Sequence, residues 1–355
     1  MPEDDHGKVR QTPMEEVIRH ANAITAPYTV EVKDIAWSSV YEVGHRITDR
    51  FDDVLAEDRG IRTPRVFIAG DACHTHSAKA GQGMNVSMQD GFNIGWKLGH
   101  VLDGRAPESL LDAYSLERQV VAQNLIDFDK EWSTLMAKPA NELGSPQEVA
   151  DFYTRTMEFP AGFMAQYEPS QIVAEAKHQE LATGFPVGKR FKSARAAKVC
   201  DTNPVHVGHF HVADGRYRVY VFADAAAPAD ASATRELAEW LQSAADSPIS
   251  AHTPADRDSS SIIDVKVIYQ QGHHDVSLND VPDAFKPIVG PFELVNLENV
   301  FALQQGADIF DERGIARDGA IDVVRPDQYV AAVLPLTAKD ELAEYFRGAL
   351  LPAAA

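Results

Sequence analysis

The segment 64–102 constrains the chain most, because it places an acidic residue and a glycine-rich loop between a predicted strand and a predicted helix. Residues 65–69 are typical of a buried strand, and they lead directly into Gly70 and Asp71. A loop with two glycines follows at 80–85, and helical spacing then continues to about residue 102. A strand, an acid at its carboxyl end and a loop that opens a helix together form a nucleotide-binding unit.

Each part of this unit has a physical role. Asp71 is an acceptor at a position where a sugar-like hydroxyl can donate. Gly81 and Gly83 allow the backbone to approach a flat ligand closely, and the N–H groups at the helix start favour a polar or negative group. Asp71 could instead cap the following turn, and the glycines could be ordinary turn residues. The ordered motif around them favours the ligand interpretation.

Four short motifs follow one another in the order of a known family. G-D-A-x-H begins at Gly70, G-Q-G-M-N spans 81–85, W-K-L spans 96–98, and Y-x-x-E-R spans 114–118. In these residues the chain resembles the FAD-dependent aromatic hydroxylases of the phenol 2-monooxygenase and 3-hydroxybenzoate 4-monooxygenase group. The resemblance implies that Asp71 binds the ribityl chain of FAD and that the loop lines the isoalloxazine and pyrophosphate. It assigns cofactor binding to Gly70, Asp71, Gly81, Gln82, Gly83, Met84 and Asn85 and leaves the catalytic residues unassigned.

The resemblance also implies a fold and an activity. The expected fold is α/β (α+β): part of a flavin-monooxygenase FAD and substrate domain, followed by a thioredoxin-like domain that dimerises. The expected boundaries are 1–60 for a remnant of the substrate domain, 61–137 for the FAD-binding part, 138–186 for a helical connector and 187–355 for the C-terminal domain. The implied activity is hydroxylation of a phenolic compound with FAD, NAD(P)H and O₂ in a homodimer.

The chain departs from the family in two places. No G-x-G-x-x-G turn for the ADP half of FAD is present anywhere in the sequence. The chain is therefore expected to be the C-terminal part of a hydroxylase, with a separate N-terminal FAD-binding half as a candidate partner. The alternative is a non-catalytic dimerisation or binding fragment, or a relic, that does not hold FAD alone. Relatives usually carry proline where this chain has Ala78, so the loop beside the flavin is expected to be less constrained here.

Composition excludes several partners. The net charge is −20 and the pI is about 5.0, which argues against nucleic acid or an anionic membrane as a partner. Two cysteines, Cys73 and Cys200, form no disulfide framework and fit a reducing, cytoplasmic location. The first twenty residues lack the apolar core of a signal peptide, and no apolar run reaches the roughly 20 residues that span a bilayer.

Local patterns predict most of the remaining elements. Helices are expected at 14–23, 107–136, 234–243 and 339–350, and strands within 30–53 and at 216–223, 262–269, 321–324 and 329–334. A turn with proline at its first corner is expected at 325–328, and exposed loops are expected at 224–234 and 244–260. Glycines 91, 95 and 99 form a stripe, which is best explained by close approach of another backbone or a ligand.

Histidines and aromatic residues outside the motif have ordinary interpretations. Cys73, His74 and His76 lie too close together in one loop to form a metal site without distant ligands, so no metal is expected. His209 and His211 are expected on one face of a strand, with His206 nearby, and His273 and His274 at a loop tip. Trp37 and Tyr41 could line an aromatic pocket with His45, but burial in a core is the expected role. Cys200 has no C-x-x-C partner, which excludes disulfide exchange of the thioredoxin type.

Overall fold

A computed structural model describes residues 12–39, 44–77, 81–138, 146–159 and 161–353. The chain divides into two units, Met1–Gly44 and His45–Ala355. The first unit contains the helix α2 (Met14–Thr25), which begins directly after Pro13 and so confirms the predicted helix. Its described residues after α2 contain no strand, so the strands predicted within 30–53 are wrong except for β1 (Arg46–Ile47), which lies in the second unit.

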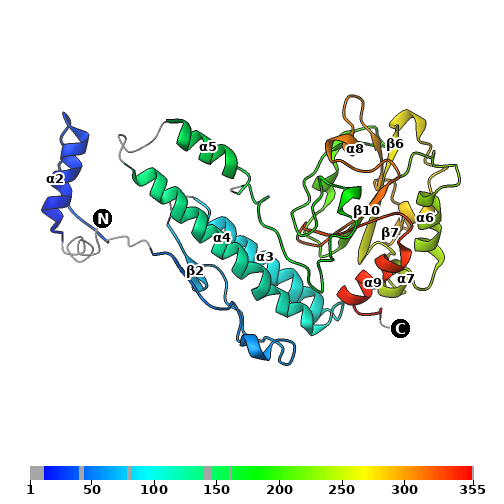
Figure 1. The fold of residues 1–355 in the computed structure, drawn as a ribbon, viewed down its shortest axis with the longest axis horizontal. Helices are drawn as coiled ribbons and strands as arrows, with labels where there is room; N and C mark the ends of the chain where they lie inside the picture. The colour runs from blue at the N-terminus through cyan, green and yellow to red at the C-terminus, as the bar shows by residue number, and fades with distance from the viewer. Residues whose placement is uncertain (1–11, 40–43, 78–80, 139–145, 160, 354–355) are drawn as a thin grey trace. The chain divides into compact units, whose positions relative to one another are not determined.

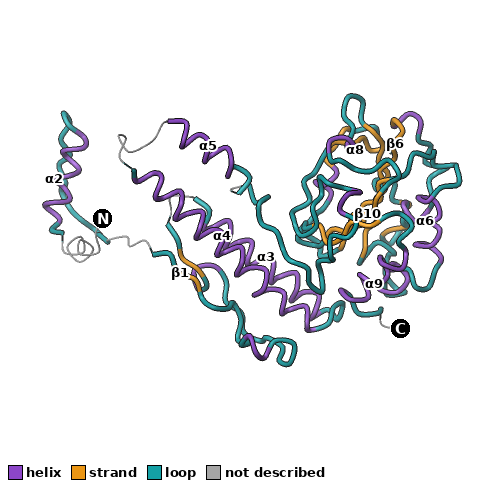
Figure 2. Tube along the Cα trace, viewed as in Figure 1, coloured by secondary structure: helices purple, strands orange, loops and turns teal. Residues whose placement is uncertain are grey.

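The second unit begins with the strand, turn and loop that carry the G-D-A-x-H and G-Q-G-M-N motifs. Two long helices follow, shown in purple in Figure 2. β1 pairs with β2 (His74–Thr75), so that Ile47 lies opposite His74. α3 (Gly83–Leu102) and α4 (Asp112–Ala137) pack against each other, with the short turn Glu108–Leu111 between them. Both helices confirm the predicted ranges to within a few residues, although a 3-10 turn replaces the first turn of the second one.

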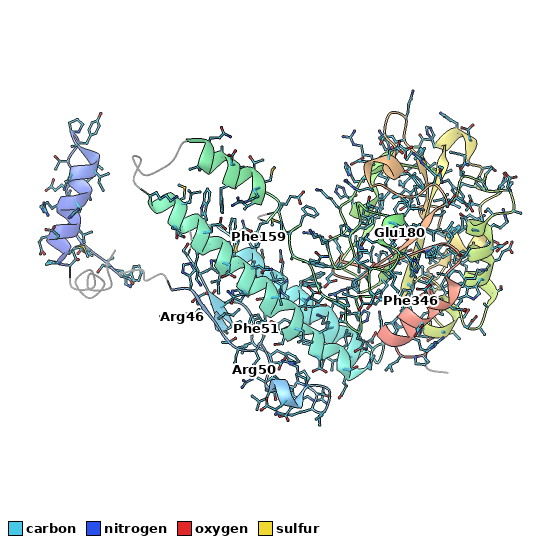
Figure 3. All side chains as sticks on the ribbon, in the orientation of Figure 1. Arg46, Arg50, Phe51, Phe159, Glu180 and Phe346 are labelled. Carbon is cyan, nitrogen blue, oxygen red and sulfur yellow. The ribbon has the colours of Figure 1, made fainter. Side chains whose placement is uncertain are left out.

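A small apolar core holds the motif segment against these two helices. Phe51, labelled beside α4 in Figure 3, is fully buried, and its backbone N–H donates to Ser115 Oγ at 2.9 Å. Tyr114 packs against the same ring, and its hydroxyl donates to the Ile68 carbonyl at 2.8 Å. Tyr114 is the first residue of the Y-x-x-E-R motif, so its role here is to fix the chain that leads into Gly70.

The connector between the helices and the C-terminal sheet contains α5 (Pro146–Thr156) and the short turn Gln179–Leu181. Phe128 of α4 stacks on Phe159 with ring centroids 4.6 Å apart, which ties the end of α5 to α4. The helical character predicted for this region is thus present, and the exact domain boundaries at 60, 137 and 186 stay a prediction.

The C-terminal part, coloured from green to red in Figure 1, is built on a mixed sheet. This sheet has seven strands in the order β11-β10-β5-β6-β9-β3-β4. Three central strands, β5 (Tyr217–Phe222), β6 (Ile263–Gly272) and β9 (Val300–Leu303), are parallel to one another. β10 pairs antiparallel with β5 and β3 pairs antiparallel with β9, and the outermost strands β11 and β4 pair antiparallel with β10 and β3. The remaining strands of the sheet are β3 (Arg195–Lys198), β4 (Pro204–His206), β10 (Ala320–Val324) and β11 (Val330–Leu334). A separate pair consists of β7 (Ile288–Val289) and β8 (Leu294–Val295).

The central strands are apolar on both sides because both faces of the sheet are covered. In β5, Tyr217, Val219 and Val221 enter one core, whereas Tyr220 and Phe222 enter the core on the opposite face. The first core is covered by α6 (Ala233–Ser243) and α9 (Lys339–Ala349), and α7 (Pro248–His252) packs beside α9. The second core includes α8 (Ile309–Glu312). The predicted strands and helices of this region are confirmed.

Three local predictions are wrong, two in this region and one in the first unit. Residues 244–260 are not simply an exposed loop, because α7 lies within them and His252 is buried. His209 lies in a 3-10 turn after β4 rather than on a strand with His211. Trp37 is exposed rather than in a core, and Tyr41 lies outside the described residues.

Candidate functional site

The G-D-A turn is a 3-10 turn, Gly70–Ala72, that only glycine can start. Gly70 has φ +59°, and a Cβ at this position would lie 2.9 Å from Ser87 Oγ of α3. The residues before the turn do not form the predicted buried strand: Val66 is 60% exposed, and Phe67 makes only an isolated bridge with Asp52. The prediction failed because an apolar run does not form a strand unless a neighbouring strand accepts its hydrogen bonds.

Asp71 is exposed on this turn, and no residue in the described ranges binds its carboxylate. The capping alternative is therefore not seen. An exposed carboxylate without a partner among the described residues remains available as an acceptor for a hydroxyl of a bound molecule.

The start of α3 combines open backbone donors with small residues. Gln82 occupies the position before the first helical residue without a side-chain cap, and it accepts a hydrogen bond from Asn85 Nδ2 at 3.1 Å. Gly81 has φ +65° and open space where a Cβ would be, whereas a Cβ at Gly83 would lie 2.8 Å from the ring of His76. The contact with His76 therefore explains why position 83 is a glycine, without a ligand. The start of the helix has backbone N–H groups without a side-chain cap, and such groups favour a polar or negative group.

The buried carboxylate of Asp90 fixes the backbone of the G-D-A-x-H motif. Asp90 of α3 accepts hydrogen bonds from the Gly70 backbone N–H at 3.1 Å and from His74 Nε2 at 2.9 Å. Arg118 of the Y-x-x-E-R motif donates to the other carboxylate oxygen at 2.7 Å. Burial alone would raise the pKa of Asp90, but the hydrogen bond from His74 and the charge of Arg118 outweigh it and lower the pKa. Asp90 is therefore an anion that fixes the backbone at the G-D-A turn.

A second buried carboxylate fixes the residues just after the motif histidines. Asp129 of α4 accepts from the backbone N–H and the hydroxyl of Ser77, both at 2.6 Å, and from His45 Nε2 at 2.8 Å. Burial alone would raise the pKa of Asp129, but the two hydrogen bonds from Ser77 lower it. The loop continues into Ala78, which lies outside the described residues, so the expectation about its flexibility stays a prediction.

The W-K-L and Y-x-x-E-R motifs meet the C-terminal part in a buried ionic cluster. Glu117 accepts from Lys97 Nζ at 2.7 Å and from both terminal nitrogens of Arg325, at 2.5 and 2.9 Å. Asp327 binds Arg325 and also accepts from Trp96 Nε1 at 3.1 Å. Burial would raise the pKa of Glu117, but the charges of Arg325 and Lys97 lower it to about 2.

The turn at 325–328 therefore has a role that its sequence did not indicate. It is a hydrogen-bonded turn, as predicted, with the Gln328 N–H donating to the Arg325 carbonyl at 2.9 Å. Arg325 is fully buried rather than solvated, because the turn inserts against α3 and α4. Two of the family motifs thus form the joint between the motif segment and the C-terminal sheet.

The remaining candidates contribute nothing to this site. The described residues contain no group of three or more histidine, cysteine or acidic side chains placed to hold a metal ion. Cys73 is buried and unpaired, and burial with the nearby Asp90 charge raises the pKa of its thiol to about 12. Cys200 is also unpaired, His206 and His209 stack with ring centroids 5.2 Å apart, and His273 begins a 3-10 turn. Among the described residues, no helix is both long and apolar enough to cross a membrane.

Sequence reasoning missed Asp90, Asp129 and Asp327 as residues that position the motif. The available signal was a charged residue inside an otherwise apolar and glycine-rich helix, as at Asp90. Such a residue needs a buried partner, but the sequence does not say which one.

Comparison with known proteins shows what this arrangement belongs to. Residues 165–354 match the family profile of the phenol hydroxylase C-terminal dimerisation domain, and residues 1–129 match that of an FAD-binding domain. The chain belongs to the FAD-dependent aromatic hydroxylase family. The expected family and fold class are confirmed.

Individual relatives agree with this family. A 3-hydroxybenzoate 4-monooxygenase from Comamonas testosteroni is 45% identical over 97% of this chain and 55% of its own length. A phenol 2-monooxygenase from Aspergillus fumigatus is 35% identical over 94% of this chain and 54% of its own length. The crystal structure of CabE, an aromatic hydroxylase from angucycline biosynthesis, has a similar fold, with a TM-score of 0.55 at 20% identity over 96% of this chain and 54% of CabE. The chain spans about half the length of the curated relatives it matches.

Proposed function

We propose that this chain is the part of an FAD-dependent aromatic monooxygenase that carries the G-D-A-x-H and G-Q-G-M-N motifs and the dimerisation domain. The proposed reaction hydroxylates a phenolic compound with NAD(P)H and O₂, and the proposed assembly is a homodimer. The chain would act together with a G-x-G-x-x-G segment, which its own 355 residues lack. The FAD-binding profile across residues 1–129 and the identity to named monooxygenases support this proposal.

The observation that carries the proposal is that Asp71 is exposed and without a partner, whereas the turn that carries it is fixed by buried hydrogen bonds. The turn that presents Asp71 is held by the buried Asp90, while the Asp71 carboxylate itself is exposed and unpartnered in the described ranges. A surface carboxylate held on so rigid a support has a fixed position but no structural partner, as expected of a residue that binds a ligand.

The residues present fit a flavin. Asp71 would accept from a ribityl hydroxyl, and the uncapped N–H groups from Gly83 to Asn85 would face a polar edge or a phosphate. Gly81 leaves open space beside the backbone for a flat ring. When bound, FAD supplies the electron transfer and oxygen activation of hydroxylation. Asp90 and Asp129 would hold the motif backbone in place, and the buried joint at Glu117 would orient it relative to the C-terminal sheet.

FAD binding by the purified chain tests the proposal directly. Flavin fluorescence would be titrated with the chain and with Asp71→Ala, and the absorption spectrum would be recorded after desalting. Asp49→Ala is the matched control, because Asp49 is also an exposed aspartate, and among the described residues its carboxylate pairs only with the neighbouring Arg50. We expect binding that weakens in Asp71→Ala and is unchanged in Asp49→Ala. Equal binding by all three proteins would remove Asp71 from the cofactor site.

A second candidate function is a dimerisation module that does not bind FAD. The continuous core of the C-terminal sheet and the dimerisation profile over 165–354 favour it. This candidate predicts a colourless dimer that stays colourless after FAD is added and removed by desalting. A monomeric chain that retains FAD would refute it.

A further inference from the structure

A pocket of about 490 Å³ lies at the edge of the C-terminal sheet that β4 forms. Side chains from β3, from β4, from the 3-10 turn after β4 and from the residue after β9 line it. They include Arg195, Val205, His206, His209, Phe210 and Gln304. None of the described residues that line this pocket is acidic, although the chain carries a net charge of −20. We call it the β4 pocket.

Strand register brings the polar side chains of the β4 pocket together. Arg195 of β3 lies directly opposite His206 of β4. β3 also pairs antiparallel with β9, where Ala197 lies opposite Ala302, so continuing this register along both strands brings Gln304 beside Arg195. Residues that lie opposite each other on neighbouring strands point to the same face of a sheet. The arginine is therefore flanked by a histidine on one side and by a carboxamide on the other.

The basic side chains of the β4 pocket are not used by the described part of the chain. Arg195 is exposed, and its guanidinium makes no hydrogen bond or ion pair with a described residue. The ring of His209 stacks on that of His206 with centroids 5.2 Å apart, and neither ring has a hydrogen-bond partner within the described ranges. A guanidinium has five N–H donors, and an imidazole has at least one. The pocket thus presents several donors that await an acceptor.

The Gln304 carboxamide is a further polar group without a partner. Its Oε1 atom is buried, and no described residue donates to it. A buried acceptor without a donor is unfavourable, so nothing holds the amide in this orientation. A half-turn of the amide would present its two N–H donors to the pocket instead. Gln304 can therefore add a hydrogen bond to an anion that binds Arg195.

The rest of the β4 pocket is apolar. The half-buried ring of Phe210 forms one wall and packs on the buried Phe301 with centroids 5.8 Å apart. Pro204 and Val205 of β4 extend this apolar surface. An apolar wall beside an unpaired guanidinium matches a molecule that has a negative head group and an apolar body.

Two other occupants fit this pocket less well. A metal ion needs more than the two histidines, and no described group of three histidine, cysteine or acidic side chains is placed to hold one. The charge of Arg195 would also repel a cation. An inorganic phosphate would gain nothing from the apolar wall, and its second negative charge would exceed the charge of one guanidinium. A carboxylate has a single charge and accepts two parallel hydrogen bonds from arginine.

We propose that the β4 pocket binds a small organic carboxylate with an apolar body. Arg195 pairs with the carboxylate, His206, His209 and Gln304 supply further hydrogen bonds, and the apolar body lies against Phe210. The pocket uses none of the residues assigned to the flavin, so this inference stands apart from the proposed cofactor and reaction.

Benzoate is the probe for this site. Its binding to the 355-residue chain would be measured by saturation-transfer NMR, together with the binding of benzamide and acetate. Benzamide keeps the ring without the charge, and acetate keeps the charge without the ring. We expect benzoate to bind at least several-fold more tightly than either molecule. Equal binding of acetate or of inorganic phosphate would overturn the organic carboxylate as the ligand.

Histidine signals locate the bound probe. The imidazole carbon signals of His206 and His209 would be recorded as benzoate is added, after assignment by substitution of each histidine. His273 and His274 are the internal controls, because they form a second pair of neighbouring rings with the same degrees of exposure and do not line the pocket. We expect the first pair of signals to shift and the second pair to stay unchanged. Benzoate binding that leaves the first pair unchanged would place the probe elsewhere and overturn the inference.

Two substitutions test the roles of the side chains. Arg195→Gln should weaken benzoate binding about tenfold or more, because it removes a charge-assisted pair. Arg257→Gln is the matched control, because Arg257 is also exposed in the C-terminal part and its side chain has no described partner. Gln304→Glu keeps the shape of the side chain but places a carboxylate beside Arg195, so it should abolish binding. None of the three substitutions should lower the melting temperature or change FAD binding.

The outcomes decide between a small molecule and a second copy of the chain. Equal benzoate binding by Arg195→Gln and Arg257→Gln would overturn the inference. Sedimentation of the same variants gives the remaining comparison. A dimer that dissociates in Arg195→Gln, together with absence of benzoate binding to the wild type, would show that a carboxylate of a second copy fills the pocket, and this result would also overturn the inference.

Discussion

The buried joint at Glu117 gives the most quantitative prediction. Glu117→Gln keeps the shape of the side chain but removes its charge, which leaves Lys97 and Arg325 buried with only Asp327 to balance them. The pKa of Glu117 falls from its usual 4.5 to about 2 in the folded chain. This difference corresponds to about 3 kcal/mol, within the range of about 3–5 kcal/mol expected when one partner of a buried ion pair is removed.

Urea unfolding at pH 7 measures this free energy. We expect Glu117→Gln to lower the free energy of unfolding by about 3 kcal/mol. The control is Glu131→Gln, because Glu131 pairs with Arg155 in an ion pair whose side chains are 60% and 67% exposed. That substitution should change the free energy of unfolding by less than about 1 kcal/mol. A loss at Glu117 as small as the loss at Glu131 would refute the reasoning.

A double variant and a pH series test the electrostatic origin. Removing Lys97 as well, in Glu117→Gln with Lys97→Met, leaves Arg325 and Asp327 balanced, so the double variant should lose less than the sum of the two single variants. Because the folded pKa of Glu117 is lowered, its contribution is complete above pH 4.5 and is lost as the pH falls towards 2. The wild type and Glu117→Gln should therefore converge in stability over that interval.

Three further predictions concern the motif turn and the sheet. Gly70→Ala, at φ +59° and in contact with a neighbouring serine, should lower stability by about 1–3 kcal/mol in calorimetry, and Gly60→Ala, at φ +77° in open space, should lower it less. Asp90→Asn leaves the Arg118 charge buried and should cost about 3–5 kcal/mol in urea unfolding; a neutral result would contradict the anionic role of Asp90. Asp322 is fully buried with both oxygens unpartnered among the described residues, and burial raises its pKa well above the usual value. Wild-type stability should therefore fall as the pH rises above about 4, and Asp322→Asn should remove that part of the slope between pH 4 and 8.

The sequence predicted those elements whose stability is encoded locally. α3 and α4 have apolar residues at helical spacing, and the β5 and β6 runs are rich in β-branched and aromatic residues. The ordered motifs around Gly70 and Gly81 likewise indicated the family without any structure. Where a pattern lacked a partner, prediction failed: residues 65–69 look like a strand, but no neighbouring strand pairs with them beyond one isolated bridge.

The positions of the charges were decided by the tertiary structure alone. Glu117 and Arg325 are 208 residues apart in sequence, and the turn that carries Arg325 has the composition of an exposed loop. An acidic side chain in a helix and a basic side chain in a turn are each stable when water solvates them, so neither residue indicates burial by itself. Only packing of the sheet against α3 and α4 removes both from water and forces them to pair. The sequence by itself therefore determined the family and the local elements, and tertiary packing determined which ions hold the motif in place.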